Sequence, residues 1–383
     1  MESAQVPTSS KKLGILIGGA GLIGGTLTHY FATAAAGEFD ILAPNSKRLS
    51  LRDPDDIRRY FSRFRPDFII NAAIAALDSD PLLALETNTM GSVLLARAAL
   101  ELGIPYIHCS TAAVLPAGEN LREEELRPLA PELANYPKSK LLAELALREL
   151  AENHGLDYTC IRLGIVYGEH DHKIQGFQRL LFSVADRAMV AFFTRKGALH
   201  SYSNARKLPH FVHHVLRHRQ EFSGQTYHFV DPNPAALHEL ILTIRAYLEL
   251  TTPREIYLPY PLARFGRDCL GRLVRALTRI GIEARMPAEL MFLKNFYQTQ
   301  TLSADKLLAS SFVDPFPAAT VLTELPRLIQ YYLTRWEQLN LIAPLAGSFF
   351  DPKKPTDLFV NAPEQLLRRI ATEAATPFLE PRR

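Results

Sequence analysis

Tyr136 and Lys140 lie four residues apart in the stretch Y-P-K-S-K, where a helical pattern begins. On a helix, residues four apart share one face, so the lysine ammonium would lie beside the phenol. A neighbouring positive charge stabilises the phenolate and lowers the pKa of Tyr136 towards the range of an acid/base catalyst. The pair predicts proton exchange with a substrate oxygen; taken alone, the same spacing also describes an ordinary surface pair.

A strand-end hydroxyl is the second candidate for chemistry. Ser110 and Thr111 close an apolar run, 106–110, that is typical of a buried strand. Open parallel sheets bind their ligands at the carboxyl ends of the strands, where a hydroxyl can hydrogen-bond a substrate oxygen. By itself such a residue is more simply a strand-end turn residue, so its weight comes from the elements around it.

A glycine-rich loop supplies the third element. The apolar run 14–17 is followed by Gly18, Gly21 and Gly24 in the spacing G-x-x-G-x-x-G, and then by a helical pattern to residue 36. Glycine allows a sharp turn and a close approach of the backbone to a pyrophosphate, which the helix N-terminus also attracts. Loop, hydroxyl and Y-x-x-x-K in this order predict a dinucleotide-dependent enzyme.

The same stretch has some features of a secretory signal peptide. Lys11-Lys12 precedes an apolar run, and small residues follow at 34–37. Five glycines between residues 18 and 25 make a poor apolar helix, so the cofactor loop is favoured.

A parallel sheet would position these residues. Apolar strand patterns at 39–43, 68–73 and 106–110 alternate with helical patterns at 54–64 and 81–102. The alternation predicts an α/β protein with a doubly wound parallel-sheet Rossmann fold. After residue 168 the pattern loosens and prolines become frequent, which indicates a smaller C-terminal substrate lobe. The expected domains are a disordered leader at 1–11, an NAD(P)-binding Rossmann domain at 12–170, mainly a substrate lobe at 171–340 with some elements returning to the core, and a tail at 341–383.

Four stretches resemble one enzyme family. They are R-P-D-F-I-I-N-A-A at 65–73, E-T-N at 86–88, I-H-C-S-T at 107–111 and R-x-x-x-V-Y-G at 162–168. Together with the glycine loop they resemble the extended short-chain dehydrogenase/reductases, also called the NAD-dependent epimerase/dehydratase family, nearest to the dTDP-dehydrorhamnose reductase branch. The resemblance covers about residues 12–170.

The resemblance implies a role for each candidate. Tyr136 would donate or accept the proton, Lys140 would bind the nicotinamide ribose and tune Tyr136, and Thr111 would orient the substrate carbonyl or hydroxyl. The implied chemistry is hydride exchange at the nicotinamide C4. The expected cofactor-binding residues are Gly18, Gly21, Leu22, Ile23, Gly24, Asn45, Lys47, Arg48, Leu51, Asn71, Ala72, Ala73, Asn88, Tyr136 and Lys140.

Three positions depart from the family pattern. Ala112-Ala113 follow Thr111 where the dehydratases have Asp-Glu, so elimination of water would lack its acid/base pair. Ala113 also replaces the tyrosine that dehydrorhamnose reductases usually carry. Ser50 stands where many members have an aspartate near the adenine, although Leu51 and its backbone remain.

The residues after the second strand indicate the choice of cofactor. An NAD site usually places a carboxylate at this strand end, on the ribose hydroxyls. Here Pro44 occupies that place, and Asn45, Lys47 and Arg48 follow. Two cations and no acid favour the 2′-phosphate of NADP over NAD, unless both cations only face solvent.

These observations predict an NAD(P)-dependent reductase or dehydrogenase that interconverts a carbonyl and a hydroxyl, with a nucleotide-linked sugar as the favoured substrate. One alternative is a sugar-nucleotide epimerase that keeps its NAD bound. Another is a hydroxysteroid-dehydrogenase-like enzyme with a lipidic substrate, which the apolar stretches 180–193 and 257–262 motivate. A dinucleotide-sensing or scaffold protein is disfavoured, because all three residues of the catalytic set are present.

Composition restricts the partners. The 383 residues carry a net charge of +3, too small to indicate nucleic acid, and no run of 18 apolar residues could span a membrane. Cys109, Cys160 and Cys269 are far apart and unpatterned, so we expect a cytoplasmic protein with a small-molecule substrate. By the resemblance, the helices at 81–102 and 137–154 would pair across a homodimer.

His210, His214 and His218 are spaced four apart and would form one stripe on a helix, which in principle could bind a metal. Arginines flank the stripe, no carboxylate is close to it in the sequence, and the family needs no catalytic metal here. We therefore expect no metal site among the histidines at 200–218, but a polar helix face at the rim of the substrate lobe.

Overall fold

The computed structural model describes residues 11–173, 176–186, 191–192, 197–279, 288–342 and 359–374. The chain divides into two compact units, Met1–Tyr332 and Leu333–Arg383. In the part of the chain that is described, no helix combines the length and the apolar character needed to cross a membrane.

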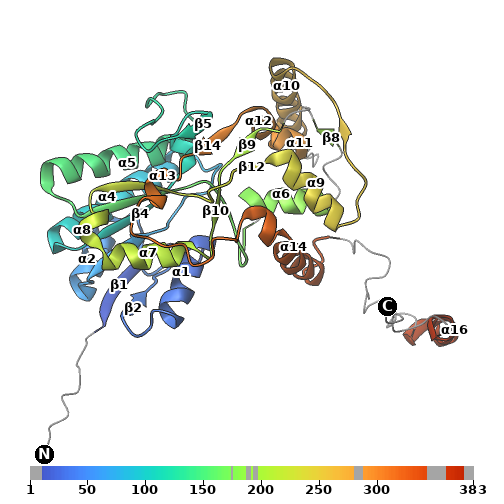
Figure 1. Cartoon of the computed structure of the whole chain (residues 1–383), viewed down its shortest axis with the longest axis horizontal. Helices are drawn as coiled ribbons and strands as arrows, with labels where there is room; N and C mark the ends of the chain where they lie inside the picture. Colours follow the sequence, from blue (N-terminus) through green and yellow to red (C-terminus); the bar gives the residue numbers. More distant parts are fainter. Residues whose placement is uncertain are drawn as a thin grey trace, which may run out of the picture. The chain divides into compact units, whose positions relative to one another are not determined.

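A parallel sheet forms the centre of the first unit, as predicted (Figure 1). Within the described residues it has six strands in the order β11-β6-β4-β3-β1-β2, and every neighbouring pair is parallel. The strand order reverses beside β1, which creates the crevice where such sheets bind ligands. The strands are β1 (Lys12–Ile17), β2 (Phe39–Leu42), β3 (Phe68–Asn71), β4 (Tyr106–Thr111), β6 (Tyr158–Leu163) and β11 (Gln225–Phe229).

Helices cover both faces of this sheet, so the predicted doubly wound Rossmann fold is confirmed. On one face α1 (Leu22–Thr33) and α7 (Leu208–Arg217) bury Leu16 and Ile70. On the other face Ile15 and Ile69 pack against three helices. These helices are α2 (Pro54–Phe64), α4 (Gly91–Leu102) and α5 (Asn135–His154).

The predicted helix at 81–102 is interrupted. It consists of α3 (Pro81–Ala84), the π-helix η1 (Leu85–Met90) and α4, and it ends at Gly103 in the left-handed conformation. The π-helix is stabilised by the tertiary contacts of Asn88 and Thr89 that are described below. Hydrophobic periodicity carries no information about such contacts, so it could not predict the π-helix.

The remaining helices and strands of the described residues surround this core or follow it in the chain. The helices are η2 (Ala112–Val114), α6 (Gly176–Ala185), α8 (Arg219–Phe222), α9 (Leu237–Tyr247), α10 (Tyr260–Arg279), α11 (Ala288–Met291), α12 (Leu293–Tyr297), α13 (Asp305–Leu308), α14 (Val321–Gln338) and α16 (Pro363–Ala374). The strands are β5 (Gly118–Leu121), β7 (Ile165–Tyr167), β8 (Ala191–Phe192), β9 (Leu199–His200), β10 (Tyr202–Asn204), β12 (Ala235–Ala236), β13 (Arg254–Glu255) and β14 (Gln300–Leu302).

The prediction for the histidine helix was wrong in its location. α7 packs against α1 over the central sheet, where Tyr30 donates or accepts a hydrogen bond at His213 Nδ1 (2.9 Å) and contacts the His210 ring at 4.6 Å. The apolar face of α7 decides this position, because Phe211 and Val212 are fully buried in the sheet cluster. α7 ends at Arg217, so His218 lies outside the helix.

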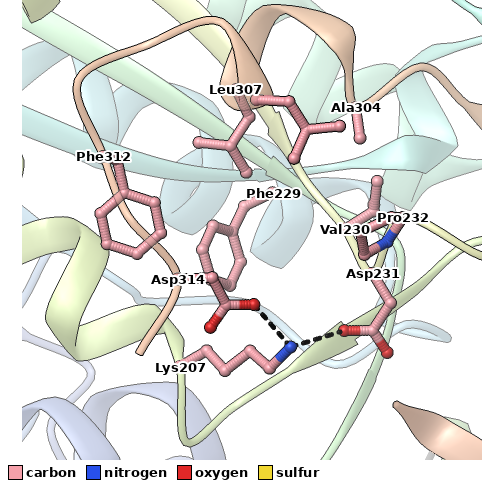
Figure 2. Close-up of a pocket in the computed structure, with 10 residues that line it drawn as sticks. Lys207, Phe229, Val230, Asp231, Pro232, Ala304, Leu307, Phe312 and Asp314 are labelled. Atoms are coloured by element: carbon pink, nitrogen blue, oxygen red, sulfur yellow. Dashed lines mark hydrogen bonds and ion pairs between the residues drawn. The ribbon is translucent and has the colours of Figure 1, made fainter. Parts of the chain in front are cut away.

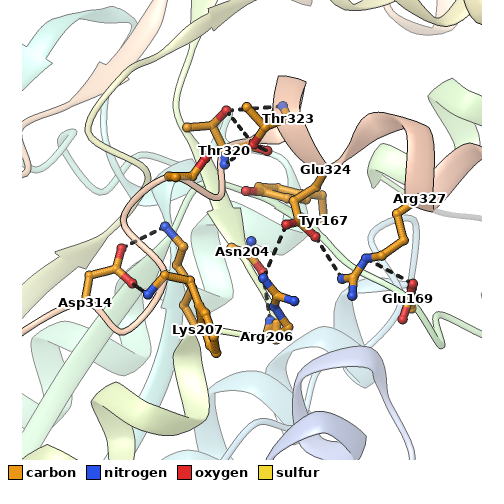
Figure 3. A network of polar contacts seen from close by, with 12 residues as sticks. Tyr167, Glu169, Asn204, Arg206, Lys207, Asp314, Thr320, Thr323, Glu324 and Arg327 are labelled. Atoms are coloured by element: carbon orange, nitrogen blue, oxygen red, sulfur yellow. Dashed lines mark hydrogen bonds and ion pairs between the residues drawn. The ribbon is translucent and has the colours of Figure 1, made fainter.

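An ion-pair network connects the segment 314–327 to the Rossmann core (Figure 3). Glu324 accepts from Arg206 at 3.3 Å and from Arg327 at 2.8 Å, and Arg327 also contacts Glu169 at 3.3 Å. Glu169 follows β7, while Arg206 precedes α7. The network therefore fixes a late stretch of chain beside the strand ends that surround the candidate site.

Candidate active site

The predicted chemical groups meet in one cavity of about 130 Å³ at the carboxyl ends of the parallel strands. Thr111 lies there at the end of β4, Tyr136 and Lys140 lie on the first turns of α5, and Ile23 comes from the first turn of α1. The other lining residues are Ala72, Ala73, Ile74, Cys109, Ser110, Leu163, Gly164 and Val166.

Tyr136 and Thr111 both line the cavity. Burial raises the pKa of the Tyr136 phenol, and the nearby Thr111 hydroxyl offsets only part of this effect. The prediction that Lys140 lowers this pKa was therefore wrong. Burial disfavours the charged phenolate, and the Lys140 ammonium makes its hydrogen bonds elsewhere.

Lys140 joins the ends of two strands. Its ammonium donates to the backbone carbonyl of Cys109 at 3.0 Å and to that of Ala73 at 3.4 Å, and the side chain is almost fully buried. Burial lowers the lysine pKa, while the charge of Glu144 acts in the opposite direction. The ammonium is thus positioned at the cavity wall by backbone oxygens from β4 and from the loop after β3.

We expect Tyr136 of the cofactor-free protein to be protonated throughout the neutral range, because its pKa is raised rather than lowered. The measurement is a titration of phenolate absorbance, taken as the difference between wild type and Tyr136→Phe. The difference signal should develop only above the ordinary tyrosine pKa of about 10. A transition near neutral pH would show that the expected positive charge does reach the phenol.

The glycine loop has the geometry that a dinucleotide requires. Gly18 has φ +87°, and a Cβ there would lie 2.7 Å from the Ala72 carbonyl carbon; a Cβ at Gly24 would lie 2.1 Å from Gly18 O. Both glycines are required by the packing of the loop itself. At Gly21 the nearest atom would be 3.5 Å away, so the protein's own packing does not need this glycine.

Gly21 is instead explained by the space it leaves for a ligand. It is the N-cap of α1 and offers no side chain to the first turn, so the N–H groups of Leu22 and Ile23 point out with the positive end of the helix dipole. A pyrophosphate fits these donors, and a side chain at Gly21 would stand in its way. The loop residues therefore fit a dinucleotide cofactor.

The two cations after β2 are held by a turn. Asn45 Oδ1 accepts from the backbone N–H groups of Lys47 (3.1 Å) and Arg48 (3.2 Å), and both cationic side chains are exposed. Among the described residues, neither cation pairs with a carboxylate. The Asn45 side chain therefore stabilises the turn, and the side chains of Lys47 and Arg48 remain available to bind an anionic group.

Three predicted cofactor-binding residues have their side chains in the interior, where they do not line the cavity. Asn71 donates to Ser92 (3.0 Å) and Tyr106 (2.9 Å), and Leu51 belongs to the apolar cluster beneath α2 and α4. Asn88 is 1% exposed. These side chains shape the walls of the site.

Asn88 lies in the π-helix η1 and connects it to the helix that carries Tyr136 and Lys140. Its amide accepts from the Ala75 N–H at 2.9 Å and donates to Ser139 Oγ at 3.0 Å, while the Thr89 hydroxyl donates to the Ser139 carbonyl at 2.8 Å. Ser139 lies between the two site residues of α5. The widened turn thus fixes the first turns of α5, and with them Tyr136 and Lys140.

A buried ion pair under the site was not predicted. Arg162 donates to Glu144 through Nη2 at 2.7 Å and through Nε at 3.0 Å, and Ser110 donates to the same carboxylate. Arg162 is fully buried, and its Nη1 also donates to the Glu123 carbonyl at 2.6 Å. A signal was present, because Glu144 continues the four-residue spacing of Tyr136 and Lys140 by one more turn.

The neighbouring histidine completes this cluster without adding charge. His228 lies 3.3 Å from Arg162 Nη1, and its backbone N–H donates to Glu123 Oε1 at 3.1 Å. Burial and the arginine charge lower its pKa to about 3, so its ring is neutral. The cluster joins α5, β6 and β11 directly beneath Ser110 and Lys140.

A smaller cavity of about 50 Å³ lies beside Lys207 (Figure 2). The ammonium of Lys207 is 2.7 Å from Asp314 and 3.8 Å from Asp231, and Tyr167 donates to Asp231 at 2.7 Å. Burial raises the pKa of Asp231 to about 6. Since carboxylates already balance this lysine, the cavity offers no free cation, and its lining within the described residues includes none of the predicted site residues.

A model of the NAD dependent epimerase/dehydratase family matches residues 15–227, more than half of the chain. The chain belongs to this family. The predicted resemblance to the extended short-chain dehydrogenase/reductases is thereby confirmed.

Two curated members of the family show the range of similarity. The ADP-L-glycero-D-manno-heptose-6-epimerase of Pseudomonas paraeruginosa is 32% identical over 178 residues, covering 42% of this chain and 53% of that protein. The dTDP-4-dehydrorhamnose reductase of Salmonella typhimurium is 30% identical over 146 residues, covering 37% and 48%. The chain thus spans about half the length of the curated relatives it matches.

The likeness to solved structures extends further but shows the fold alone. The dTDP-4-dehydrorhamnose reductase of Bacillus anthracis in complex with NADP aligns with a TM-score of 0.59 at 16% identity, over 85% of this chain and 99% of that one.

Proposed function

We propose that this protein reduces a carbonyl to a hydroxyl, or oxidises it in reverse, on a nucleotide-linked sugar, with NADP as the preferred cofactor. The observation that supports the proposal is the single cavity shared by Thr111, Tyr136 and Lys140, next to a glycine loop built for a pyrophosphate. The names of the curated relatives, one reductase and one epimerase of nucleotide-linked sugars, support the substrate class.

In the reduction, Thr111 and Tyr136 both hydrogen-bond the substrate carbonyl oxygen. The Tyr136 phenol is protonated at neutral pH because its pKa is raised, so it is ready to donate its proton to that oxygen. Lys140, fixed by the carbonyls of Cys109 and Ala73, presents its ammonium at the cavity wall, where it would hold the nicotinamide ribose through a charge-assisted hydrogen bond. A nicotinamide held beside these residues would supply the hydride.

Dehydration is not part of the proposal. Thr111 is followed by Ala112 and Ala113 in the short helix η2, and Thr111 itself caps this helix by accepting from the Ala113 N–H at 3.2 Å. No carboxylate stands at these two positions, so an acid/base pair for the elimination of water is missing there.

The test distinguishes reductase from epimerase by the fate of the cofactor. Purified protein is denatured and the released dinucleotide is measured; in parallel, NADPH oxidation is followed with nucleotide-linked 4-keto sugars. Stoichiometric NADPH oxidation with no retained dinucleotide supports the reductase. Tightly retained NAD, with interconversion of sugar epimers and no net NADPH oxidation, would contradict it and identify an epimerase.

We expect NADPH to bind roughly ten- to a hundred-fold more tightly than NADH. A charge-assisted hydrogen bond from Lys47 or Arg48 to the 2′-phosphate contributes about 1.5–3 kcal/mol. Titration of both cofactors into wild type and the Lys47→Ala/Arg48→Ala variant measures the preference, with Arg52→Ala as a nearby control. Equal affinities of the wild type, or a preference for NADH, would show that these cations only face solvent.

We also propose a homodimer in which the helical segment 81–102 (α3, η1 and α4) and α5 of each subunit form the contact. The two helical segments pack against one another, and Leu82 on α3 and Leu85 and Met90 on η1 are 42–57% exposed, as an apolar contact patch would be in a free subunit. A two-fold axis would bury the same patch of both copies. Sedimentation at micromolar concentration should give a dimer, and Leu85→Glu/Met90→Glu should give a monomer; a monomeric wild type would end this proposal.

The compartment we propose is the cytoplasm. All three cysteines are free, and the exposed Cys269 would be open to oxidation outside a reducing compartment. Fractionation of cells of the source organism would test this.

A further inference from the structure

Among the described residues, helix α10 packs against the rest of the first unit along one side. Ala263 is buried, Leu270 and Val274 on the same side are half-buried, and the helix contacts α12. At its start, the Tyr260 and Tyr297 rings pack at 5.1 Å, and the Tyr297 hydroxyl donates to the Leu258 carbonyl. In Figure 1 this helix is labelled next to α11 and α12.

Another side of α10, about a third of a turn from the packed side, carries an exposed stripe of mostly apolar residues. Leu262, Phe265 and Leu273 have 59%, 67% and 53% of their surface accessible, and Cys269 between them and Ala276 after them are exposed as well. The spacing of three and four residues puts all five on one helical face. An apolar stripe of this length on the surface of a protein calls for an apolar partner.

The loop before α10 extends this surface. Ile256 and Tyr257 are 47% and 67% exposed, and they precede the stripe by a few residues. Tyrosine combines an apolar ring with a polar hydroxyl and is well suited to the boundary between water and lipid.

The charge of α10 is strongly positive. The helix contains five arginines against one acidic residue, Asp268. Asp268 is shared between Arg267, at 2.7 Å, and Arg264, at 3.9 Å, so it cannot balance the charge of the helix, which stays positive. An anionic surface complements this charge, whereas a second copy of α10 would bring arginines against arginines.

We propose that α10 binds the surface of an anionic phospholipid membrane, with the stripe of Leu262, Phe265, Cys269, Leu273 and Ala276 inserted between the headgroups. A basic helix with Phe and Leu on one face and low overall hydrophobicity lies in the membrane interface and does not cross it. The arginines stay at the depth of the phosphates, because their long side chains reach from the helix to the headgroups.

The proposal is tested by sedimentation of the full chain with vesicles of phosphatidylcholine alone, and with vesicles of equal parts phosphatidylcholine and phosphatidylglycerol. Wild type should sediment with the mixed vesicles and much less with the neutral ones, and added salt should release it. Phe265→Gln/Leu273→Gln should lower the partition coefficient by on the order of ten-fold for each side chain removed. Arg272→Gln, which removes an exposed charge beside the stripe, should lower it by about five-fold on mixed vesicles only.

The matched control is Leu129→Gln/Val313→Gln, which replaces two apolar residues of 47% and 81% exposure elsewhere on the surface and should leave binding unchanged. Cys269, the exposed cysteine among the three of the chain, takes a polarity-sensitive fluorophore, whose emission should shift to the blue on mixed vesicles. The proposal fails if wild type stays in the supernatant with both vesicles, if the stripe variant binds like wild type, or if the stripe causes self-association without lipid.

Discussion

Replacing Tyr136 by phenylalanine is expected to lower turnover by roughly 10²–10⁴-fold, the usual loss when a general acid is removed, while cofactor affinity stays nearly unchanged. The phenol donates the proton to the substrate oxygen, and phenylalanine keeps the ring that fills the cavity wall. Steady-state rates and a cofactor titration measure the two effects separately.

Two further variants make this result specific. Tyr60→Phe, which changes a tyrosine on α2 away from the lining of the cavity, should leave turnover unchanged. Lys140→Ala should lower both turnover and cofactor affinity, because the ammonium lies between the strand ends beside the cofactor loop. Turnover of Tyr136→Phe within a few-fold of wild type would remove this residue from the mechanism.

Glu144→Leu is expected to cost about 3–5 kcal/mol of unfolding free energy, because it leaves the Arg162 guanidinium charged and uncompensated in the interior. The loss should appear in chemical denaturation. Replacing both partners, in Glu144→Leu/Arg162→Met, removes the buried charge together with its partner and should recover a substantial part of the stability.

The exposed pair of Asp55 and Arg58 on α2 is the control. Its side chains are 66% and 73% accessible, so Asp55→Ala should change the stability by less than about 1 kcal/mol. A Glu144→Leu variant as stable as this control would show that the interior around Arg162 admits water or rearranges, and that the cluster does not hold α5 in place.

The sequence by itself determined the local parts of this protein. The positive φ of Gly18 and the close packing of Gly24 against the Gly18 carbonyl both require a residue without a side chain. The spacing of the glycines in the sequence therefore predicts the turn. The strands that follow are recognisable because both faces are buried and their residues are apolar throughout. The four-residue spacing of Tyr136 and Lys140 survives folding for the same reason, since it depends only on helical geometry.

The tertiary structure decided the electrostatics of the site. Tyr136 has a raised pKa because burial outweighs the effect of the nearby Thr111, and Lys140 donates to the Cys109 and Ala73 carbonyls, which come from β4 and from the loop after β3. Burial and backbone geometry are properties of the packed chain. A spacing of residues places two groups on one face but does not say which atoms surround them.

Tertiary structure also decided which elements support the site. The π-helix places Asn88 in hydrogen-bond contact with Ser139, 51 residues later in the sequence. Arg162 contacts Glu144 and Glu123 because β6, α5 and the loop after β5 pack together. The helix of His210 lies over the central sheet because its apolar face, with Phe211, is drawn into the core there. Contacts between distant segments are set by the burial of whole faces, so they are settled only when the chain has packed.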